Sequence, residues 1–239
     1  AFTIGIGAGN GCDGQVLVWQ DMPCGGGRYD PVVVSAPLVT DIHLKDSAYL
    51  LFGRESKAGR GEFMTELRAM VQHLYNCPCI AMWVPFNEGW GQFDAARAVG
   101  VIHEIDTSRT VDHASGWHDQ GIGETKSLHV YFRPYVFKPD RRGRAVILTE
   151  FGGYNCLVPG HSFNDRDFGY KRLGNADKLR AALKELYSQQ IAPAYEQGLA
   201  AAIYTQVSDV EDELNGLITY DRQVVKIPPE TVRNIVKVD

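Results

Sequence analysis

The 239-residue sequence has no long apolar run and no excess of positive charge. No window approaches the roughly 18 uninterrupted apolar residues that indicate a membrane-spanning helix. The formal net charge is −5, whereas nucleic-acid-binding domains usually carry a basic patch or stripe. We therefore expect neither a membrane nor a nucleic acid among the partners of this chain.

A disulfide framework and a secretory signal are also missing from the sequence. The cysteines are Cys12, Cys24, Cys77, Cys79 and Cys156. Their odd number, their irregular spacing and the lack of a CxxC pair argue against both a disulfide scaffold and a zinc site. The first residues contain neither a basic segment nor a long apolar segment, so no signal peptide is expected. These features together predict reduced thiols and a cytoplasmic location.

Apolar runs and amphipathic stretches alternate along the chain. The expected strands cover residues 16–21, 80–85, 110–116, 127–132, 145–149 and 199–206. The expected helices cover residues 61–75, 93–105, 176–195 and a short segment after 229. The glycine-rich residues 1–15 are expected to be irregular, and residues 28–60 to form a long excursion. Continuously apolar strands separated by helices are typical of a parallel sheet that is buried on both faces.

Polar or aromatic residues follow each of the expected strands. A (β/α)8 barrel places its active site at the rim formed by the C-terminal ends of its strands, whereas a doubly wound sheet binds ligands at one crevice. Contributions from so many strands favour a ring. The predicted fold is therefore α/β, a TIM (β/α)8-type barrel, in a single domain that covers residues 1–239. The six expected strands are two short of the complete barrel.

Glu88 and Glu150 are the two carboxylates of greatest interest, because each follows an apolar strand, "IAMWVPFNE" and "AVILTE". At a common rim they would form the carboxylate pair that glycoside hydrolysis needs, one residue protonating the departing oxygen and the other attacking the sugar or activating water. Two alternatives need no catalysis. Glu88 could be a carboxylate at the start of a helix, stabilised by the helix dipole, and Glu150 a solvated residue before Gly152.

Aromatic side chains accompany these strand ends. Trp19, Trp90, Trp117 and Tyr131 lie at or near them, where flat rings could form the walls of a sugar pocket. Trp83 lies in the middle of its strand and is expected in the core, since Trp is highly buried on average.

Several segments together resemble the catalytic barrel of glycoside hydrolase family two, the family of bacterial β-galactosidases, β-glucuronidases and β-mannosidases. These segments are "PFNEGWG", "SGWHDQG", "SLHVYFRPY", "LTEFGGY" and "YTQVSDVEDELNGLITYDR". The resemblance extends from about Val16 to Asp221. It implies that about strands 3–8 of the barrel are present, and that the jelly-roll and immunoglobulin-like domains that usually precede the barrel are absent.

The resemblance also implies a retaining mechanism, with Glu88 as general acid/base and Glu150 as nucleophile. Asn87 would hydrogen-bond the sugar 2-hydroxyl, and Tyr131 would donate a hydrogen bond to the nucleophile. The remaining residues expected to line the sugar pocket are His129, Trp117, Asp21, Gln206 and Trp90. No cofactor is expected, and no convincing set of metal ligands is present.

The resemblance implies an exo-β-glycosidase that acts on terminal β-D-glycosides. The family's glucuronidases carry an Asn-x-Lys-Gly element that this sequence lacks, so a neutral sugar is expected, first a β-galactoside and then a β-mannoside or β-glucoside. The expected partner is the carbohydrate substrate, and either a second copy of the chain or the remainder of a longer polypeptide would cover the open barrel.

Two other functions stay open at this point. The chain could be a non-catalytic or degenerate carbohydrate-binding fragment, which would still bind sugar after replacement of Glu150. It could also be an unrelated α/β barrel enzyme that holds a metal with Asp112, His113 and His118.

Overall fold

The computed structural model describes residues 3–6, 14–18, 32–35, 57–89, 92–164 and 169–237. The chain divides into two compact units. The Glu88 unit comprises Val16–His129 and Asp140–Ile147, and the Glu150 unit comprises Ala1–Gln15, Val130–Pro139 and Leu148–Asp239. No helix among the described residues is long and apolar enough to cross a membrane.

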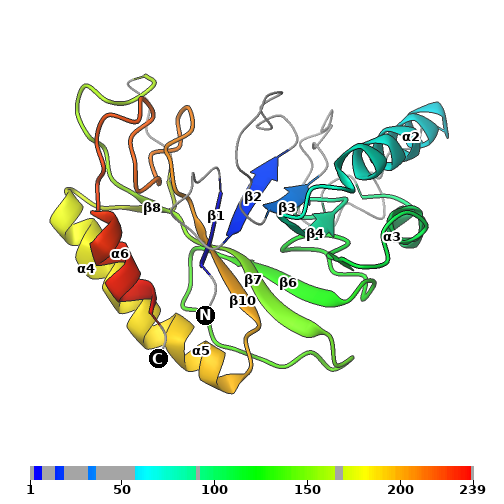
Figure 1. The fold of residues 1–239 in the computed structure, drawn as a ribbon. Coiled ribbons are helices and arrows are strands. Elements are labelled where there is room, and N and C mark those ends of the chain that lie inside the picture. The colour runs from blue at the N-terminus through cyan, green and yellow to red at the C-terminus, as the bar shows by residue number, and fades with distance from the viewer. Residues whose placement is uncertain are drawn as a thin grey trace. The chain divides into compact units, whose positions relative to one another are not determined.

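Parallel strands form the sheet of the Glu88 unit (Figure 1). Four of its strands are neighbours in the order β5-β4-β3-β2. They are β2 (Gly14–Val18), β3 (Val32–Ser35), β4 (Ile80–Val84) and β5 (Thr110–Val111). β6 (Thr125–Val130) lies next to β7 (Ala145–Gly152), whose first residues belong to this unit. The parallel pairing confirms the predicted sheet type.

Helices α2 (Lys57–Leu74) and α3 (Ala95–His103) pack against each other in the same unit. The apolar face of α2 is buried, and Leu67 and Val71 lie in a core cluster with Trp83. Burial of each such aliphatic side chain contributes about 1.5–3 kcal/mol. Trp83 is fully buried, as expected for a residue in the middle of a strand.

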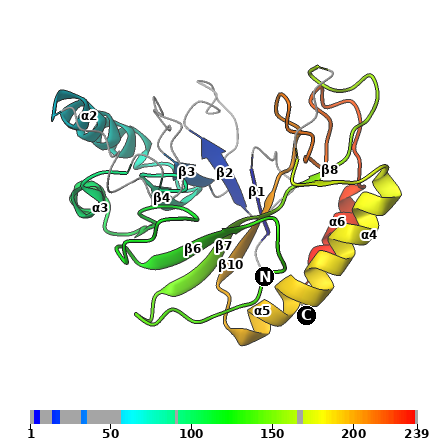
Figure 2. The ribbon, with the colours of Figure 1, turned by 180° about the vertical axis from the view of Figure 1, so that it is seen from behind.

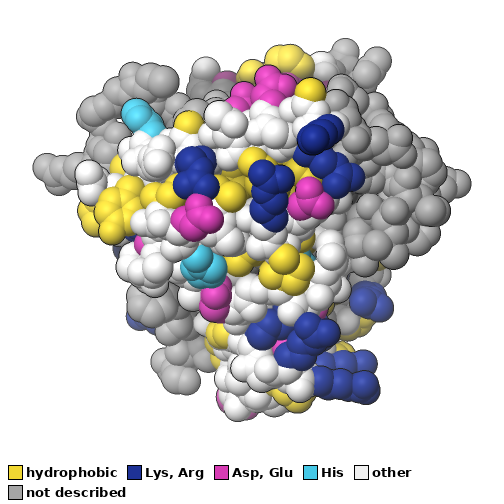
Figure 3. All heavy atoms as spheres, turned by 90° about the vertical axis from the view of Figure 1, so that its right-hand side faces the viewer, with side chains coloured by type: hydrophobic (Ala, Val, Ile, Leu, Met, Phe, Trp, Pro, Cys, Tyr) yellow, Lys and Arg dark blue, Asp and Glu magenta, His cyan; other side chains and the backbone are white. Residues whose placement is uncertain are grey.

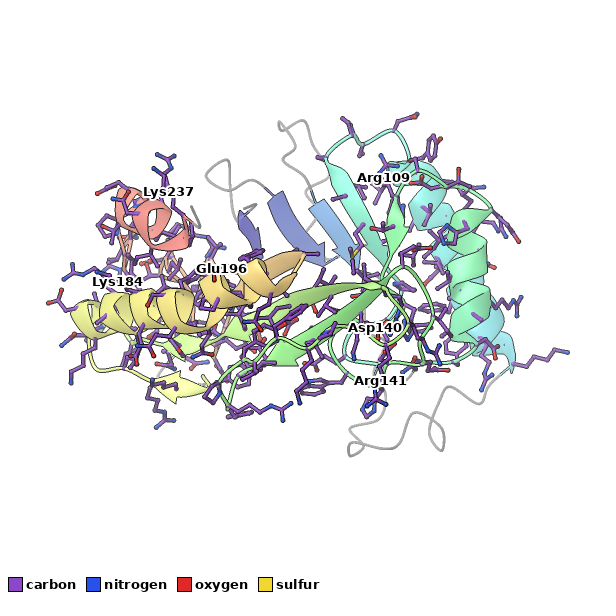
Figure 4. The ribbon with its side chains drawn as sticks, turned by 90° about the horizontal axis from the view of Figure 1, so that it is seen from below. Arg109, Asp140, Arg141, Lys184, Glu196 and Lys237 are labelled. Atoms are coloured by element: carbon purple, nitrogen blue, oxygen red, sulfur yellow. The ribbon has the colours of Figure 1, made fainter. Side chains whose placement is uncertain are left out.

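The loop before β5 holds the beginning of β4 in place. Asp106 accepts hydrogen bonds from Trp83 Nε1 at 2.8 Å and from Arg109 Nη1 at 2.6 Å. Arg109, which is labelled in Figure 4, also donates to the carbonyls of Ile80 and Cys77, at 2.8 and 2.9 Å. Burial alone would raise the pKa of Asp106, but the hydrogen bonds that it accepts hold this pKa well below its usual range.

The surface that carries α2 and α3 has interspersed charges of both signs (Figure 3). Arg68 pairs with Glu104, and Arg60 pairs with Asp94 at 3.2 Å. Exposed pairs of this kind contribute little to stability, roughly 0–1 kcal/mol each.

The Glu150 unit contains β1, β10 and β7 as neighbouring strands. β1 (Thr3–Ile6) is parallel to β10 (Ala201–Thr205), with Ile4 opposite Ile203. A short parallel pair, β8 (Tyr154–Asn155) and β9 (Lys171–Arg172), also belongs to this unit.

A continuous helical run follows β9. It consists of α4 (Ala176–Leu186), the π-helical turn η2 (Tyr187–Ile191) and α5 (Ala192–Gln197). Asn175 caps it by accepting a hydrogen bond from Lys178 N at 2.9 Å, and Gly198 ends it in the left-handed region. α6 (Pro229–Val236) lies beside α4 (Figure 2). The exposed residues Lys184 and Glu196 mark the solvent side of α4 and α5 (Figure 4).

Most of the predicted elements are confirmed, and two expectations are wrong. Residues 1–15 are not irregular throughout, because they contain β1 and the beginning of β2. The excursion at residues 28–60 contains β3, and α2 already begins there, at Lys57. The described part of the chain is thus α/β with parallel strands, and closure of these strands into a barrel stays a prediction.

Candidate active site

The turn after β4 carries Asn87 and Glu88. The backbone ladder between β4 and β5 continues beyond both strands, because Ser115 N donates to Phe86 O at 2.9 Å and Glu88 N donates to Ser115 O. Asn87 also forms an isolated parallel bridge with Ser115. Glu88 has a φ of 55°, which is uncommon for a residue other than glycine and costs of order 1–3 kcal/mol. The surrounding hydrogen bonds thus hold Glu88 in an unfavourable conformation, a feature that often marks a functional site.

The carboxylate of Glu88 is hydrogen-bonded to a buried histidine. Glu88 Oε1 lies 3.0 Å from His129 Nδ1, and His129 Nε2 lies 3.0 Å from Ser115 Oγ. The His129 side chain is fully buried, whereas that of Glu88 is 20% exposed. His129, which the sequence analysis expects in the sugar pocket, therefore contacts Glu88, the predicted acid/base residue.

A second set of hydrogen bonds supports this arrangement. Gly116 N donates to Ser127 Oγ at 3.0 Å, and Ser127 Oγ donates to Asp112 Oδ1 at 3.0 Å. Gly116 has a φ of 91°, and a Cβ at this position would overlap the ring of His129. Asp112 is fully buried, and this burial raises its pKa to about 6. Gly116 thus packs against the ring of His129, and Ser127 links the backbone of Gly116 to the buried carboxyl group of Asp112.

Trp117 lies at the margin of this cluster. Its side chain is among the exposed large hydrophobic groups, at 37%. The indole Nε1 donates to the carbonyl of His129 at 3.4 Å, and the two rings meet edge to face at 6.1 Å. Trp117 therefore has a partly exposed ring that contacts His129, and a contact of this ring with a sugar stays a prediction.

The residues of the alternative metal site have other contacts. His113 Nε2 accepts a hydrogen bond from Gln120 N at 3.1 Å, and burial lowers the pKa of His113. The backbone carbonyl of His118 accepts from Gln92 Nε2 at 2.9 Å. Within the described ranges, Asp112, His113 and His118 do not come together as a set of metal ligands. This arrangement argues against the metal-dependent alternative.

In the Glu150 unit, Glu150 lies near the end of β7 and accepts a hydrogen bond from the hydroxyl of Tyr131. Thr205 Oγ1, at the end of β10, lies 3.2 Å from the same hydroxyl. Tyr170 stacks on Tyr131 with ring centroids 3.7 Å apart. Burial, together with the charge of Glu150, raises the pKa of Tyr131 well above its usual range. The phenol therefore stays protonated and can donate to the carboxylate.

Two glycines after Glu150 allow the chain to pass these rings. Gly152 and Gly153 have φ values of 88° and 60°, and a Cβ at either position would overlap a tyrosine ring. Gly153 N also donates to Thr205 O at 2.8 Å. The turn after Glu150 is therefore a close-packed segment, which argues against a merely solvated turn.

Gln206 is buried beside the loop that follows β10. Its amide nitrogen donates to Glu213 Oε2 at 3.0 Å and to Asn215 Oδ1. Farther along, Lys226 Nζ pairs with Asp209 Oδ1 at 2.7 Å, and both side chains are almost completely buried. These contacts fix the loop, so the amide donors of Gln206 serve the protein itself.

Three residues predicted for the sugar pocket, Trp19, Asp21 and Trp90, lie outside the described residues. Three residues that contact the predicted site were missed, namely Ser115, Tyr170 and Thr205. Thr205 and Ser115 could have been found as polar residues at or after strands, whereas no signal in the sequence points to Tyr170.

Comparison with known proteins finds similarity at the level of the fold and assigns no family. No family model matches the chain. A 3-methyl-2-oxobutanoate hydroxymethyltransferase from Frankia casuarinae is 74% identical over 27 residues, which are 11% of this chain and 9% of that protein. A segment of this length assigns no family to the chain.

Among solved structures, the chain is similar to an FMN-binding β-glucuronidase from Faecalibacterium prausnitzii L2-6, with a TM-score of 0.61 and 15% identity. The likeness covers 96% of this chain and 39% of that one. For a β-D-glucuronidase from Dictyoglomus thermophilum the TM-score is 0.62, the identity 13%, and the coverage 96% and 45%. A calcium-binding mutant of Bacteroides uniformis β-glucuronidase 2 gives a TM-score of 0.57 at 14% identity, with coverage of 89% and 29%. The chain thus has the fold of part of these proteins and spans less than half of their length.

Proposed function

We propose that this chain contributes the catalytic residues of a retaining β-glycosidase, with Glu150 as nucleophile and Glu88 as general acid/base. The observation that carries the proposal is the hydrogen bond from Tyr131 to Glu150. A hydrogen bond to the charged form of a carboxylate favours that form, and a nucleophile must be ionised to attack. The similarity in fold to β-glucuronidases supports the same reaction class.

The reaction would proceed in two displacements. In the first, a carboxylate oxygen of Glu150 attacks the anomeric carbon, the glycosidic bond breaks, and Glu88 gives its proton to the leaving oxygen. In the second, Glu88 takes a proton from water, which attacks the same carbon and releases Glu150. Asn87, next to Glu88, would hydrogen-bond the sugar 2-hydroxyl. This chemistry requires the two carboxyl groups to lie about 5–5.5 Å apart in the working enzyme.

A neutral β-D-sugar is the proposed substrate, with a β-galactoside first. The absence of an Asn-x-Lys-Gly element from the sequence supports this choice. The second candidate is a β-glucuronide, because the similar solved structures are β-glucuronidases. Since those proteins are longer than this chain, the activity of the whole protein is part of the proposal.

Covalent labelling tests the reaction and the sugar together. The chain, and the longest natural polypeptide that contains it, are incubated with 2-deoxy-2-fluoro-β-glycosides of galactose, glucose, mannose and glucuronic acid that carry a dinitrophenyl leaving group. Peptide mass mapping then locates the label. Label on Glu150 supports the proposal, and the sugar that reacts fastest identifies the substrate class. Glu150→Gln should take no label, whereas Glu185→Gln, on the exposed side of α4, should label normally.

Absence of label on both polypeptides with all four sugars would refute the proposal that this chain is part of a retaining β-glycosidase. Sugar binding that survives in Glu150→Gln would then favour the non-catalytic carbohydrate-binding alternative.

Replacement of Tyr131 by Phe tests the contact that carries the proposal. It removes the hydroxyl donor to Glu150 while the ring that stacks on Tyr170 stays. A hydrogen bond to a charged group contributes about 1.5–3 kcal/mol, so the rate of labelling should fall by about 10- to 100-fold. An unchanged rate would show that this hydrogen bond does not serve the nucleophile.

A further inference from the structure

Glu88, His129 and Ser115 form a hydrogen-bonded chain with the geometry of a nucleophile–histidine–acid triad. The serine hydroxyl lies 3.0 Å from Nε2 of the imidazole, and the carboxylate lies 3.0 Å from Nδ1. In hydrolases of the acyl-transfer type, the same two ring nitrogens contact the nucleophilic serine and the orienting carboxylate, respectively.

Burial argues against an acyl-transfer role. Ser115 is only 7% exposed and the His129 side chain is fully buried, whereas the Glu88 side chain is 20% exposed. A nucleophile must reach its substrate, and here the serine is at the buried end of the chain. The carboxylate is the end that solvent and substrate can reach. In this chain the group that would react with the substrate is therefore Glu88, and the serine takes the orienting place that the carboxylate has in a triad.

Packing holds the imidazole in one orientation. Gly116 leaves no room for a Cβ against the ring, and Trp117 donates its indole proton to the carbonyl of His129. The hydroxyl of Ser115 can donate to Nε2, which leaves the ring proton on Nδ1, where it points at Glu88 Oε1. The ring thus has a defined place and one favoured tautomer.

We infer that His129, oriented by Ser115, is a positioning residue that reserves Oε1 of Glu88 as a hydrogen-bond acceptor and leaves Oε2 as the oxygen that exchanges protons with substrate. This inference rests on the proposed function of Glu88. The Nδ1 proton donates to Oε1 both when Glu88 is protonated on Oε2 and when it is ionised. Proton transfer to the leaving oxygen therefore requires no change of tautomer in His129.

The variants Ser115→Thr and Ser115→Val provide a matched pair. Both add one methyl-sized group at the same buried position, but only Thr retains a hydroxyl for Nε2. The kinetic comparison uses an alkyl β-glycoside, which needs the acid, and a dinitrophenyl β-glycoside, whose leaving group needs little protonation. We expect Ser115→Val to lower kcat/KM for the alkyl glycoside about tenfold relative to Ser115→Thr, the effect of one hydrogen bond. The two variants should be nearly equal on the dinitrophenyl glycoside. Equal loss on both substrates would indicate a merely structural role and overturn the inference.

The tautomer of His129 provides a readout that needs no activity. Nitrogen-15 NMR of histidine-labelled protein, with His129 assigned through His129→Gln, should show the proton on Nδ1 in the wild type and in Ser115→Thr. A proton on Nε2 in the wild type would overturn the inference. Because this measurement is independent of turnover, it distinguishes a failure of the positioning role from a failure of the glycosidase proposal. If all glycosides are inert but the Nδ1 tautomer is found, only the proposed reaction fails.

Discussion

Replacement of Asp112 by Asn should remove a specific dependence of stability on pH. Asp112 is fully buried, and its Oδ1 accepts a hydrogen bond from Ser127. Burial raises the pKa of Asp112 from 3.8 to about 6 in the folded protein. Asn has the same shape and can accept the same hydrogen bond, but it does not ionise.

The sign and size of the effect follow from this pKa. Because the folded pKa lies above the unfolded one, the native state binds more protons than the unfolded chain between these two values. The free energy of unfolding therefore falls as the pH rises through this window, and the loss is complete above the folded pKa. A shift of about two pKa units corresponds to about 3 kcal/mol.

The assay is urea unfolding of the wild type and of Asp112→Asn, monitored by tryptophan fluorescence at a series of pH values from about pH 4 to pH 7.5. We expect the stability of the wild type relative to the variant to fall by about 3 kcal/mol across this range. Asp106→Asn is the matched control, because the folded pKa of Asp106 is lowered. Between about pH 4 and pH 7.5 the stability difference between the wild type and Asp106→Asn should therefore stay nearly constant, because it is lost only as the pH falls from the unfolded pKa towards the lower folded pKa. A difference between the wild type and Asp112→Asn that does not change with pH would refute the reasoning.

Two further substitutions test other parts of the structure. Gly116→Ala should lower the free energy of unfolding by about 2–4 kcal/mol, because a Cβ at its positive φ overlaps the ring of His129. Gly100→Ala is its control, since a Cβ there meets nothing within 4 Å, and thermal unfolding should show an unchanged or slightly higher Tm. Lys226→Met should cost about 3–5 kcal/mol by leaving Asp209 buried without its cation. Denaturant unfolding should show recovery of much of this loss when Asp209→Asn is added, and no recovery would contradict the ion-pair argument.

Helices and long strands were predictable because their apolar periodicity is strong. The apolar residues of α2 recur at helical spacing, and Leu67, Met70, Val71 and Leu74 lie in the core. β4 and β7 were equally clear, since each is a continuous apolar run.

The short strands β1 and β3 could not be predicted for local reasons. β1 lies in "TIGIGAG", where alternating glycines weaken every strand signal. β3 is a strand of four residues, three valines and a serine, between prolines, and an apolar run this short cannot be told from a loop by periodicity. Pairing with β10 and β4 places these segments in sheets, and such pairing is a tertiary effect.

The positions of the two candidate carboxylates at or after strands could be predicted from the sequence, but the contacts around them could not. The hydrogen bond between Tyr131 and Glu150 was expected only through the family resemblance, because sequence spacing does not fix which strand ends meet. The contact between His129 and Glu88 joins residues far apart in the chain. Ser115 was missed because a serine in a polar turn is also what an ordinary loop contains.

Each candidate carboxylate is held by groups of its own unit, so a substitution beside Glu88 should leave the surroundings of Glu150 unchanged. Glu88 is held through His129 and Ser115, whereas Glu150 is held by Tyr131. Loss of the Ser115 hydroxyl therefore leaves the donor to Glu150 in place. An inactivator with a dinitrophenyl leaving group needs the nucleophile but little help from the acid, so it should label Glu150 in Ser115→Val almost as fast as in the wild type. The same change should slow turnover of an alkyl glycoside, because departure of an alkoxide needs a proton from Glu88. The labelling reaction and this proton transfer thus depend on different carboxylates, which are held by different groups.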